Sequence, residues 1–184
     1  SVEIVNRASW ASGVVINRGV DAGETVTMKN SKLNVYYRAF YVVDNANGTI
    51  EIDNCDITGS IYALNVNSAS SQELVIKCTN SKLHGWSSYG EIKSASFENV
   101  EFSKGASQYD HLRPYADTTL KNCTFDDGFK MGAGTTGFTI TIEDCTYNGT
   151  LLTAANVENL MLDRDDLNEL KGCTITVNGT TVTL

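Results

Sequence analysis

Basic residues, proline, histidine and long apolar stretches are all scarce in this chain of 184 residues. Acidic residues outnumber lysine and arginine by 22 to 14, so the net charge is −8, and nucleic acid, which needs clustered basic side chains, is not an expected partner. No stretch approaches the roughly 18 apolar residues of a transmembrane helix, so membrane insertion is not expected either. The five cysteines and two histidines form no CxxC or Cys/His cluster, so no metal site and no other cofactor is predicted.

The abundant residue types favour strands and turns. Threonine, valine, isoleucine and tyrosine suit strands, whereas asparagine and the 15 glycines suit turns. Apolar residues make up 41% of the chain, which is enough for a buried core. Length and composition together predict one all-β domain over residues 1–184.

One short pattern recurs along the chain and predicts the fold. Apolar and polar residues alternate, an asparagine or aspartate follows, and two of the next three positions are again apolar or small, as in TVTMKN-SKL from Thr25 to Leu33. The turn residues of the six copies, 19 to 26 residues apart, are Asn30, Asn54, Asn80, Asn99, Asn122 and Asp144. Asparagine tolerates the left-handed backbone that a bend between two short strands needs. With a third strand in the rest of each repeat, the pattern predicts a right-handed parallel β-helix of about six to seven coils, each of roughly 22 residues.

Stacked coils place equivalent residues above one another at about 4.8 Å, which predicts interior columns. The columns are Met28, Ile52, Cys78, Phe97, Leu120 and Ile142; Ser31, Cys55, Ser81, Val100, Cys123 and Cys145; and Leu33, Ile57, Leu83, Phe102, Phe125 and Tyr147. Cysteines in these columns are expected to be buried, reduced thiols, and Cys123 and Cys145, on adjacent coils, are the one pair placed for a disulfide. The stacked asparagines predict a structural ladder of amides rather than a binding site.

The two ends are expected to differ from the regular coils, because open strand edges invite aggregation unless they are covered. Residues 1–24 predict a partial coil and cap, residues 25–147 the regular coils, and residues 148–184 the last coil and a C-terminal cap. Within this cap a short helix is predicted from Asp163, its N-cap, to Leu170, with Gly172 as the stop. Asn178-Gly179 then predicts a β-hairpin.

The phrases TLKNCTFDDGF and TITIEDCTYNG resemble repeats of secreted and surface-exposed bacterial proteins and of phage structural proteins. Over roughly residues 25–147 the chain resembles the pectin-lyase-like right-handed β-helix superfamily. The resemblance implies the architecture and an extracellular or cell-surface location. It leaves the activity open, since the superfamily includes polysaccharide lyases, glycoside hydrolases, phage tailspikes and adhesin-like proteins without known chemistry.

An enzyme of this class would need acidic residues beside an open groove. The best acidic pair, Asp126-Asp127, resembles the adjacent aspartates of polygalacturonase-like enzymes, but the accompanying Asn-x-Asp, Gly-His-Gly and Arg-x-Lys elements are absent. His111 and Arg113 lie in the most unusual stretch of the chain and resemble lyase elements only loosely, with a different spacing. Adjacent acids followed by a glycine are more often a solvated turn, so no catalytic residue is assigned.

Aromatic residues give the other functional signal. Six of them follow the inward apolar position of successive coils and therefore map to one side: Tyr36, Tyr37, Tyr62, Trp86, Tyr89 and Tyr109. Aromatic rings flanked by polar groups are favoured at binding surfaces, although strand alternation must place about half of these in the core. The candidate ligand-binding residues are Tyr62, Trp86, Tyr89, Tyr109 and Arg113.

These observations favour a non-catalytic extracellular β-helix scaffold, adhesin-like in character, that binds carbohydrate or a ligand on a host or cell surface. One alternative is a pectin-lyase-like polysaccharide lyase or glycoside hydrolase, with Asp126, Asp127, His111 and Arg113 as its catalytic candidates. The other is a segment of a phage tail fibre or tailspike. The sequence carries no signal for the oligomeric state.

Overall fold

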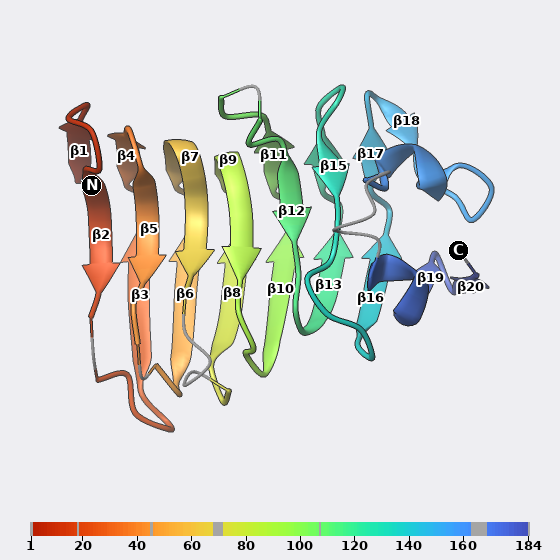
Figure 1. Ribbon diagram of the computed structural model, residues 1–184, viewed down its shortest axis with the longest axis horizontal. Coiled ribbons are helices and arrows are strands. Elements are labelled where there is room, and N and C mark those ends of the chain that lie inside the picture. The colour runs from red at the N-terminus through yellow and green to blue at the C-terminus, as the bar shows by residue number, and fades with distance from the viewer. Residues whose placement is uncertain are drawn as a thin grey trace.

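The computed structural model describes residues 2–17, 19–44, 46–67, 72–106, 108–162 and 169–183. The chain forms a parallel β-solenoid with five complete three-sided turns and an incomplete turn at each end (Figure 1). Successive turns lie side by side along the long axis, and the two termini lie at opposite ends. The expected parallel β-helix is confirmed, with five complete turns where about six to seven coils were expected.

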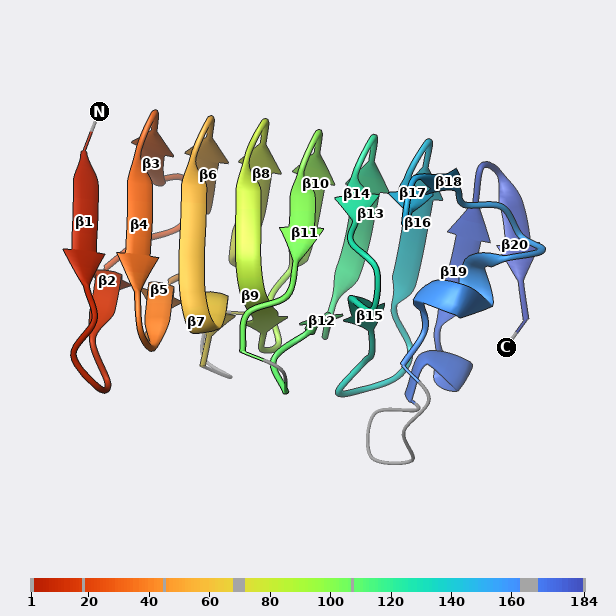
Figure 2. The ribbon, with the colours of Figure 1, turned by 90° about the horizontal axis from the view of Figure 1, so that it is seen from above.

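Each side of the solenoid is a parallel sheet with one strand from each turn (Figure 2). The first side consists of β3 (Thr25–Lys29), β6 (Thr49–Asp53), β8 (Val75–Thr79), β10 (Ser94–Glu98), β13 (Asp117–Lys121), β16 (Thr139–Glu143) and β19 (Thr174–Val177). The second side consists of β1 (Glu3–Asn6), β4 (Lys32–Val35), the first parts of β7 (Asp56–Val66) and β9 (Lys82–Tyr89), β11 (Glu101–Ser103), β14 (Thr124–Phe125) and β17 (Thr146–Tyr147). The third side consists of β2 (Ser12–Ile16), β5 (Arg38–Val42), the last parts of β7 and β9, β12 (His111–Arg113) and β15 (Lys130–Met131). The long strands β7 and β9 therefore continue around one corner.

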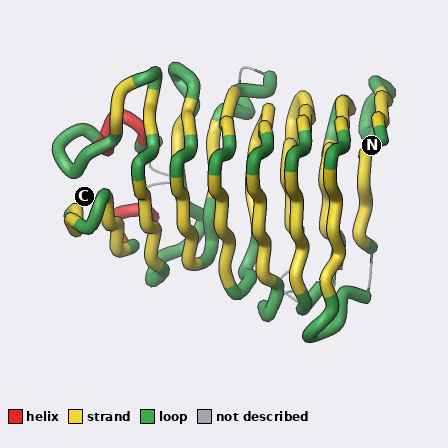
Figure 3. Tube along the Cα trace, turned by 180° about the vertical axis from the view of Figure 1, so that it is seen from behind, coloured by secondary structure: helices red, strands yellow, loops and turns green. Residues whose placement is uncertain are grey.

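The corner between the first and second sides is the bend that the asparagines were expected to occupy. Figure 3 shows it as a row of short loop segments between strands. All six repeat residues have left-handed backbones with φ between 50° and 54°: Asn30, Asn54, Asn80, Asn99, Asn122 and Asp144. The side-chain amide of Asn54 donates to Oδ1 of Asn30 at 2.7 Å, and that of Asn99 donates to Asn80 at 3.1 Å. The ladder is interrupted between these pairs, because Asn80 donates to Asp53 at 3.0 Å instead of to Asn54.

The interior columns have the expected register. Ile52 pairs with Met28 on one side and Cys78 on the other, and the series continues in step through the first side. The second side aligns its inward residues in the same way. Its rings stack, with the centroids of Phe102 and Phe125 5.0 Å apart and their planes within 10°. This packing forms one continuous core along the solenoid.

The position after the asparagine has a polar role besides its burial in several turns, although Val100, which follows Asn99, has no side-chain donor or acceptor. The backbone N–H of Cys55 donates to Oγ of Ser81 at 3.0 Å, and that hydroxyl donates to the carbonyl of Thr79 at 2.6 Å. In the same way the N–H of Cys123 contacts Sγ of Cys145 at 3.3 Å. Serine and cysteine therefore suit this column because they are small and can form hydrogen bonds.

All five cysteines are free thiols, and four of them are buried. Cys123 and Cys145 are thus neighbours without a disulfide. Desolvation raises the pKa of the Cys78 thiol to about 12. The pKa of Cys123 is also raised, because its neighbour Cys145 and burial both disfavour a thiolate there. The expectation of buried, reduced thiols agrees with this arrangement.

The C-terminal end closes with antiparallel strands and short 3₁₀ helices. β18 (Thr150–Leu151) folds back on β17, and η1 (Val157–Leu160) follows. The predicted helix from Asp163 falls on residues 163–168, which lie outside the described part of the chain. From residue 169 the backbone forms η3 (Glu169–Gly172), and β19 pairs with β20 (Thr180–Val182) in an antiparallel hairpin around Asn178-Gly179.

Candidate functional site

A column of aromatic rings runs along the solenoid where the second and third sides meet. In-register pairing places Tyr62 beside Trp86 on the next turn. Ring centroids lie 4.9 Å apart for Trp10 and Tyr37, 5.9 Å for Tyr37 and Tyr62, 4.9 Å for Tyr62 and Trp86, and 5.7 Å for Trp86 and Tyr109. We call these five rings the aromatic column. It extends over the incomplete first turn and the four that follow.

The rings in the middle of the column stack on one another rather than facing solvent. The planes of Tyr62 and Trp86 lie within 8°, and those of Trp86 and Tyr109 within 29°. The faces of Trp86 are therefore covered by its two neighbouring rings, and its indole Nε1 is enclosed as well. Trp10 differs, because its ring meets Tyr37 edge-on at 77° and is 74% exposed.

A groove of about 340 Å³ lies on the third side next to the aromatic column. It is lined by Tyr62, Asn65, Val66, Asn67, Trp86, Ser88, Gly90, Glu91, Arg113 and Tyr115. The strand register explains the hollow: small Ser88 lies between Asn65 on one neighbouring strand and Arg113 on the other. A short side chain between two long ones leaves a depression in the sheet surface, and Trp86 forms its aromatic wall.

Three polar atoms of groove residues are enclosed and have no hydrogen-bond partner in the described part of the chain. They are Nε1 of Trp86, Nε of Arg113 and Oδ1 of Asn65. The Asn65 amide nitrogen is engaged, since it donates to the carbonyl of Ser88 at 3.5 Å. The great majority of enclosed polar groups in proteins are satisfied, so three unsatisfied ones in a single groove are informative. Two donors and one acceptor of the groove residues are thus left without a partner.

The cations beside the column are held by aromatic rings. The guanidinium carbon of Arg38 lies 4.4 Å from the ring centre of Tyr37 and 4.2 Å from that of Tyr41. Arg113 lies 5.2 Å from the ring centre of Tyr115. Neither arginine forms an ion pair among the residues that the structure describes. Burial is the main reason why the pKa of Tyr62 is raised, so its phenol stays protonated and can donate.

The structure brings four of the five predicted ligand-binding residues together. Tyr62, Trp86 and Arg113 line the groove, and Tyr109 continues the aromatic column beside it. Tyr89 does not belong to the site: its side chain is fully buried, and its hydroxyl contacts Oγ1 of Thr118 at 2.7 Å. The reason is strand alternation, because Tyr89 lies three positions beyond Trp86 on the same strand and points inward.

Sequence reasoning missed several members of the site. Trp10 precedes the repeats, so no repeat pattern could place it on the column. Tyr115 follows the only proline, outside the strand pattern, and no feature of the repeat marks Asn65 as a groove residue. Tyr37 was noted among the aromatic residues, but its ring contact with Tyr62 on the next turn required the register of β5 against β7.

The residues proposed for an enzyme lie on two segments, the turn after β14 and the strand β12. Asp126 and Asp127 are exposed in the turn between β14 and β15. The pKa of Lys82, on the second side, is raised mainly by its hydrogen bond to Glu101, and the negative charge of Asp126 adds to this effect. His111 is buried on the third side, 2% exposed, with its ring 4.6 Å from that of Trp86. Within the described ranges, no group of three or more acidic, histidine or cysteine side chains is placed to hold a metal ion.

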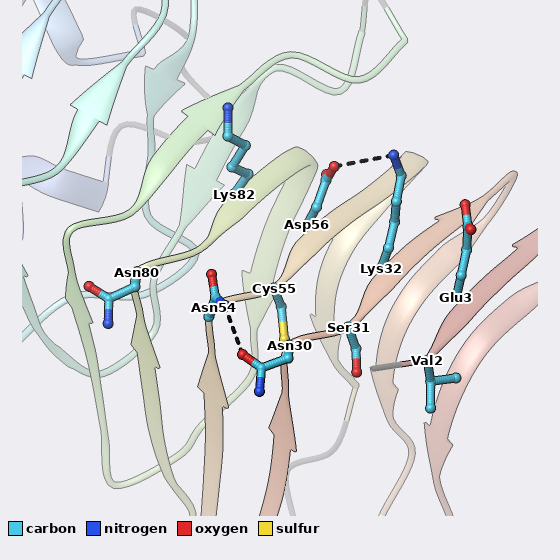
Figure 4. Close-up of a pocket in the computed structure, with 10 residues that line it drawn as sticks. All are labelled: Val2, Glu3, Asn30, Ser31, Lys32, Asn54, Cys55, Asp56, Asn80 and Lys82. Atoms are coloured by element: carbon cyan, nitrogen blue, oxygen red, sulfur yellow. Dashed lines mark hydrogen bonds and ion pairs between the residues drawn. The ribbon is translucent and has the colours of Figure 1, made fainter.

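A second depression, of about 450 Å³, follows the asparagine corner near the N-terminus (Figure 4). Two pairs of its polar side chains contact each other: Asn54 donates to Asn30, and Nζ of Lys32 lies 3.5 Å from a carboxylate oxygen of Asp56. The groove on the third side, with its unsatisfied atoms, is therefore the better candidate site.

Comparison with protein-family models, curated proteins and solved structures finds no match for this chain. Among the described residues there is also no helix with the length and apolar character needed to span a bilayer.

Proposed function

We propose that this protein is a non-catalytic, adhesin-like extracellular scaffold that binds carbohydrate in the groove beside the aromatic column. The observation that carries the proposal is the set of unsatisfied atoms on Trp86, Arg113 and Asn65. An enclosed donor or acceptor without a partner costs about 1–3 kcal/mol, and a ligand that supplies the missing partner recovers this energy.

The chemistry of these atoms suits a sugar. A hydroxyl group both accepts and donates, so neighbouring hydroxyls of one saccharide satisfy the donors of Trp86 and Arg113 and the acceptor of Asn65. The apolar C–H groups of the sugar ring pack against Tyr115 and the aromatic edges of Tyr62. The volume of about 340 Å³ lies within the range of small-molecule sites.

The rigid frame supports recognition rather than turnover. The groove is built on β7, β9 and β12, which pair in one sheet, so its polar atoms are held in place before a ligand arrives. Such preorganisation lowers the entropic cost of binding. The solenoid fold and the repeat phrases support a relationship to the pectin-lyase-like superfamily and a surface location as part of the same proposal.

The test is a glycan array followed by calorimetric titration of the saccharides that bind. Trp86→Phe keeps an aromatic ring but removes the indole N–H, and it should weaken binding by about 1–3 kcal/mol. Trp10→Phe is the matched control, since it makes the same change on the aromatic column outside the groove. Asp126→Asn should leave affinity unchanged.

Three results would contradict the proposal: no saccharide binds, Trp10→Phe weakens binding as much as Trp86→Phe, or the protein cleaves a bound polysaccharide and Asp126→Asn abolishes the cleavage. The last result would instead support the hydrolase or lyase alternative.

A further inference from the structure

The third side carries two partly buried cations, Arg38 and Arg113. Within the described ranges neither forms an ion pair, although acidic residues outnumber basic ones by 22 to 14 in the chain. Nε of each guanidinium is enclosed and has no hydrogen-bond partner in the same ranges. Charged groups that leave water are normally paired, so an anion would be stabilised at each of the two arginines.

The strand register places the two arginines at opposite ends of one row of residues. Pairing of β5, β7, β9 and β12 aligns Tyr41, Asn65, Ser88 and Arg113, and the guanidinium carbon of Arg38 lies 4.2 Å from the ring centre of Tyr41. The row crosses the strands and therefore follows the long axis of the solenoid (Figure 1). Because neighbouring strands lie about 4.8 Å apart, its two ends are about 14 Å apart. This distance exceeds the size of one sugar ring, so anions at the two ends belong to different residues of a saccharide chain.

Tyr62 links the two cations through the groove. Its ring lines the groove, and the guanidinium carbon of Arg38 lies 5.6 Å from the ring centre. Burial raises the pKa of the Tyr62 phenol, and the positive charges of Arg38 and Arg113 both oppose this rise. Both arginines are therefore near the same phenol, and the groove extends from Arg113 toward Arg38.

The middle of the row favours an uncharged group. Asn65 is 5% exposed, and its Oδ1 has no hydrogen-bond partner among the described residues. This oxygen can only accept a hydrogen bond, and an ionised carboxylate or sulfate has no hydrogen to donate. A sugar hydroxyl or an amide N–H can donate to it. Ser88, beside Asn65, is uncharged, and Glu91 adds a negative charge to the groove lining. An anion is thus favoured at the two ends of the row and disfavoured between them.

We propose that the groove binds an acidic saccharide in which charged and uncharged residues alternate, with its chain along the solenoid axis and its anionic groups at Arg113 and Arg38. This inference rests on the carbohydrate binding proposed above and adds the class of saccharide. Guanidinium groups bind carboxylate and sulfate alike through charge-assisted hydrogen bonds, so the anionic group is an oxyanion of either kind. The uncharged residue between the two anionic groups donates to Asn65.

The first experiment is calorimetric titration of the wild-type chain with hexasaccharides of matched length. Hyaluronan carries a carboxylate on alternate residues, its carboxyl-reduced form carries none, and oligogalacturonate carries one on every residue. Keratan sulfate that is sulfated only on its N-acetylglucosamine residues is the alternating ligand with sulfate in place of carboxylate. At least one of the two alternating ligands should bind about tenfold more tightly than the neutral and the uniformly charged ones.

The outcomes of this titration separate the inference from the proposed function. Tightest binding of the neutral hexasaccharide, or of oligogalacturonate, would overturn the inference and leave carbohydrate binding in place. A chain that binds no saccharide at all would overturn both. The comparison uses only the wild type, so it does not depend on whether a variant folds.

The second experiment tests the two arginines with the alternating hexasaccharide that binds. Arg113→Gln and Arg38→Gln each remove one cation, and each should weaken binding about tenfold. Lys29→Gln is the matched control, since it makes the same change of charge at an exposed residue on the first side, and it should leave affinity unchanged.

Ligand length gives a further test of the span between the arginines. The hexasaccharide should bind the wild type more tightly than the disaccharide of the same series, which is too short to reach both cations. Arg38→Gln and Arg113→Gln should each remove most of this gain. A gain that persists in both variants, or an equal loss of affinity in Lys29→Gln, would overturn the proposal.

Discussion

The asparagine corner allows a quantitative test of what holds the turns together. Asn54 has a left-handed backbone, with φ at 52°, and donates its amide to Asn30 at 2.7 Å. Asn54→Ala removes the hydrogen bond and places a residue with poor tolerance for this conformation at the bend. Asn54→Gly removes the same hydrogen bond, but glycine adopts positive φ without steric cost.

The magnitudes follow from these two contributions. Holding an ordinary residue in the left-handed conformation costs about 1–2 kcal/mol. An exposed amide hydrogen bond contributes about 0.5–1 kcal/mol. Asn54→Ala should therefore lower the free energy of unfolding by about 2–3 kcal/mol, and Asn54→Gly by about 1 kcal/mol. Asn122→Ala should fall between them, because Asn122 has the same backbone, with φ at 50°, and no amide bond of the ladder joins it to Asn99.

Urea unfolding followed by circular dichroism measures the three variants against the wild type. The slopes of the transitions should agree, so that the midpoints report stability directly. If Asn54→Gly were as destabilising as Asn54→Ala, backbone strain at the bend would not be the reason for asparagine, and this explanation of the repeat would be wrong.

Three further predictions concern thiols, acid stability and the core. Because burial raises the pKa of Cys78 to about 12, this thiol should react slowly with Ellman's reagent at pH 8 in the native state and quickly after denaturation; rapid native labelling would show that the column is open. Hydrogen bonds from Asn80 and Thr79 lower the pKa of Asp53 from its ordinary value of 3.8. The ionised Asp53 carboxylate should therefore stabilise the fold fully above pH 3.8, and this stabilisation should be lost as the pH falls through the lowered pKa. In Asp53→Asn the free energy of unfolding should therefore fall less steeply as the pH is lowered below 3.8. The same acid dependence in the variant and the wild type would contradict this. Tyr89→Phe should lower the free energy of unfolding by about 1 kcal/mol, because it removes the hydrogen bond to Thr118, and should leave the affinity for saccharide unchanged. A loss of affinity would show that Tyr89 contributes to the binding site.

The fold could be predicted from the sequence because its rules are local and repeated. Six bends need a residue that tolerates positive φ, and the strand period then assigns each neighbouring residue to the interior or the surface. The column from Met28 to Ile142 followed from this counting alone. The polar role of the column that contains Cys55 and Ser81 did not, because its hydrogen bonds join different turns and depend on the geometry of the bend.

The candidate site was only partly predictable for a related reason. The aromatic residues Tyr62, Trp86 and Tyr109 each follow the inward apolar position of their coil by three to seven residues, so their common side was visible in the sequence. The groove depends instead on Ser88 lying between Asn65 and Arg113, which come from other turns. Tyr89 was misplaced among the candidates although burial alternates without interruption along β9, so that counting from inward Leu83 already places Tyr89 in the core.

The most direct test of the central claim uses the two tryptophans of the chain as reporters. In a ¹H–¹⁵N correlation spectrum each indole N–H gives one side-chain signal, and Trp10→Phe and Trp86→Phe assign them. Titration with a saccharide selected on the array should shift the Trp86 indole signal, because its N–H gains the acceptor that it lacks in the free protein, and leave the Trp10 signal in place. A bound saccharide that leaves the Trp86 indole signal unmoved would show that the groove is not the binding site.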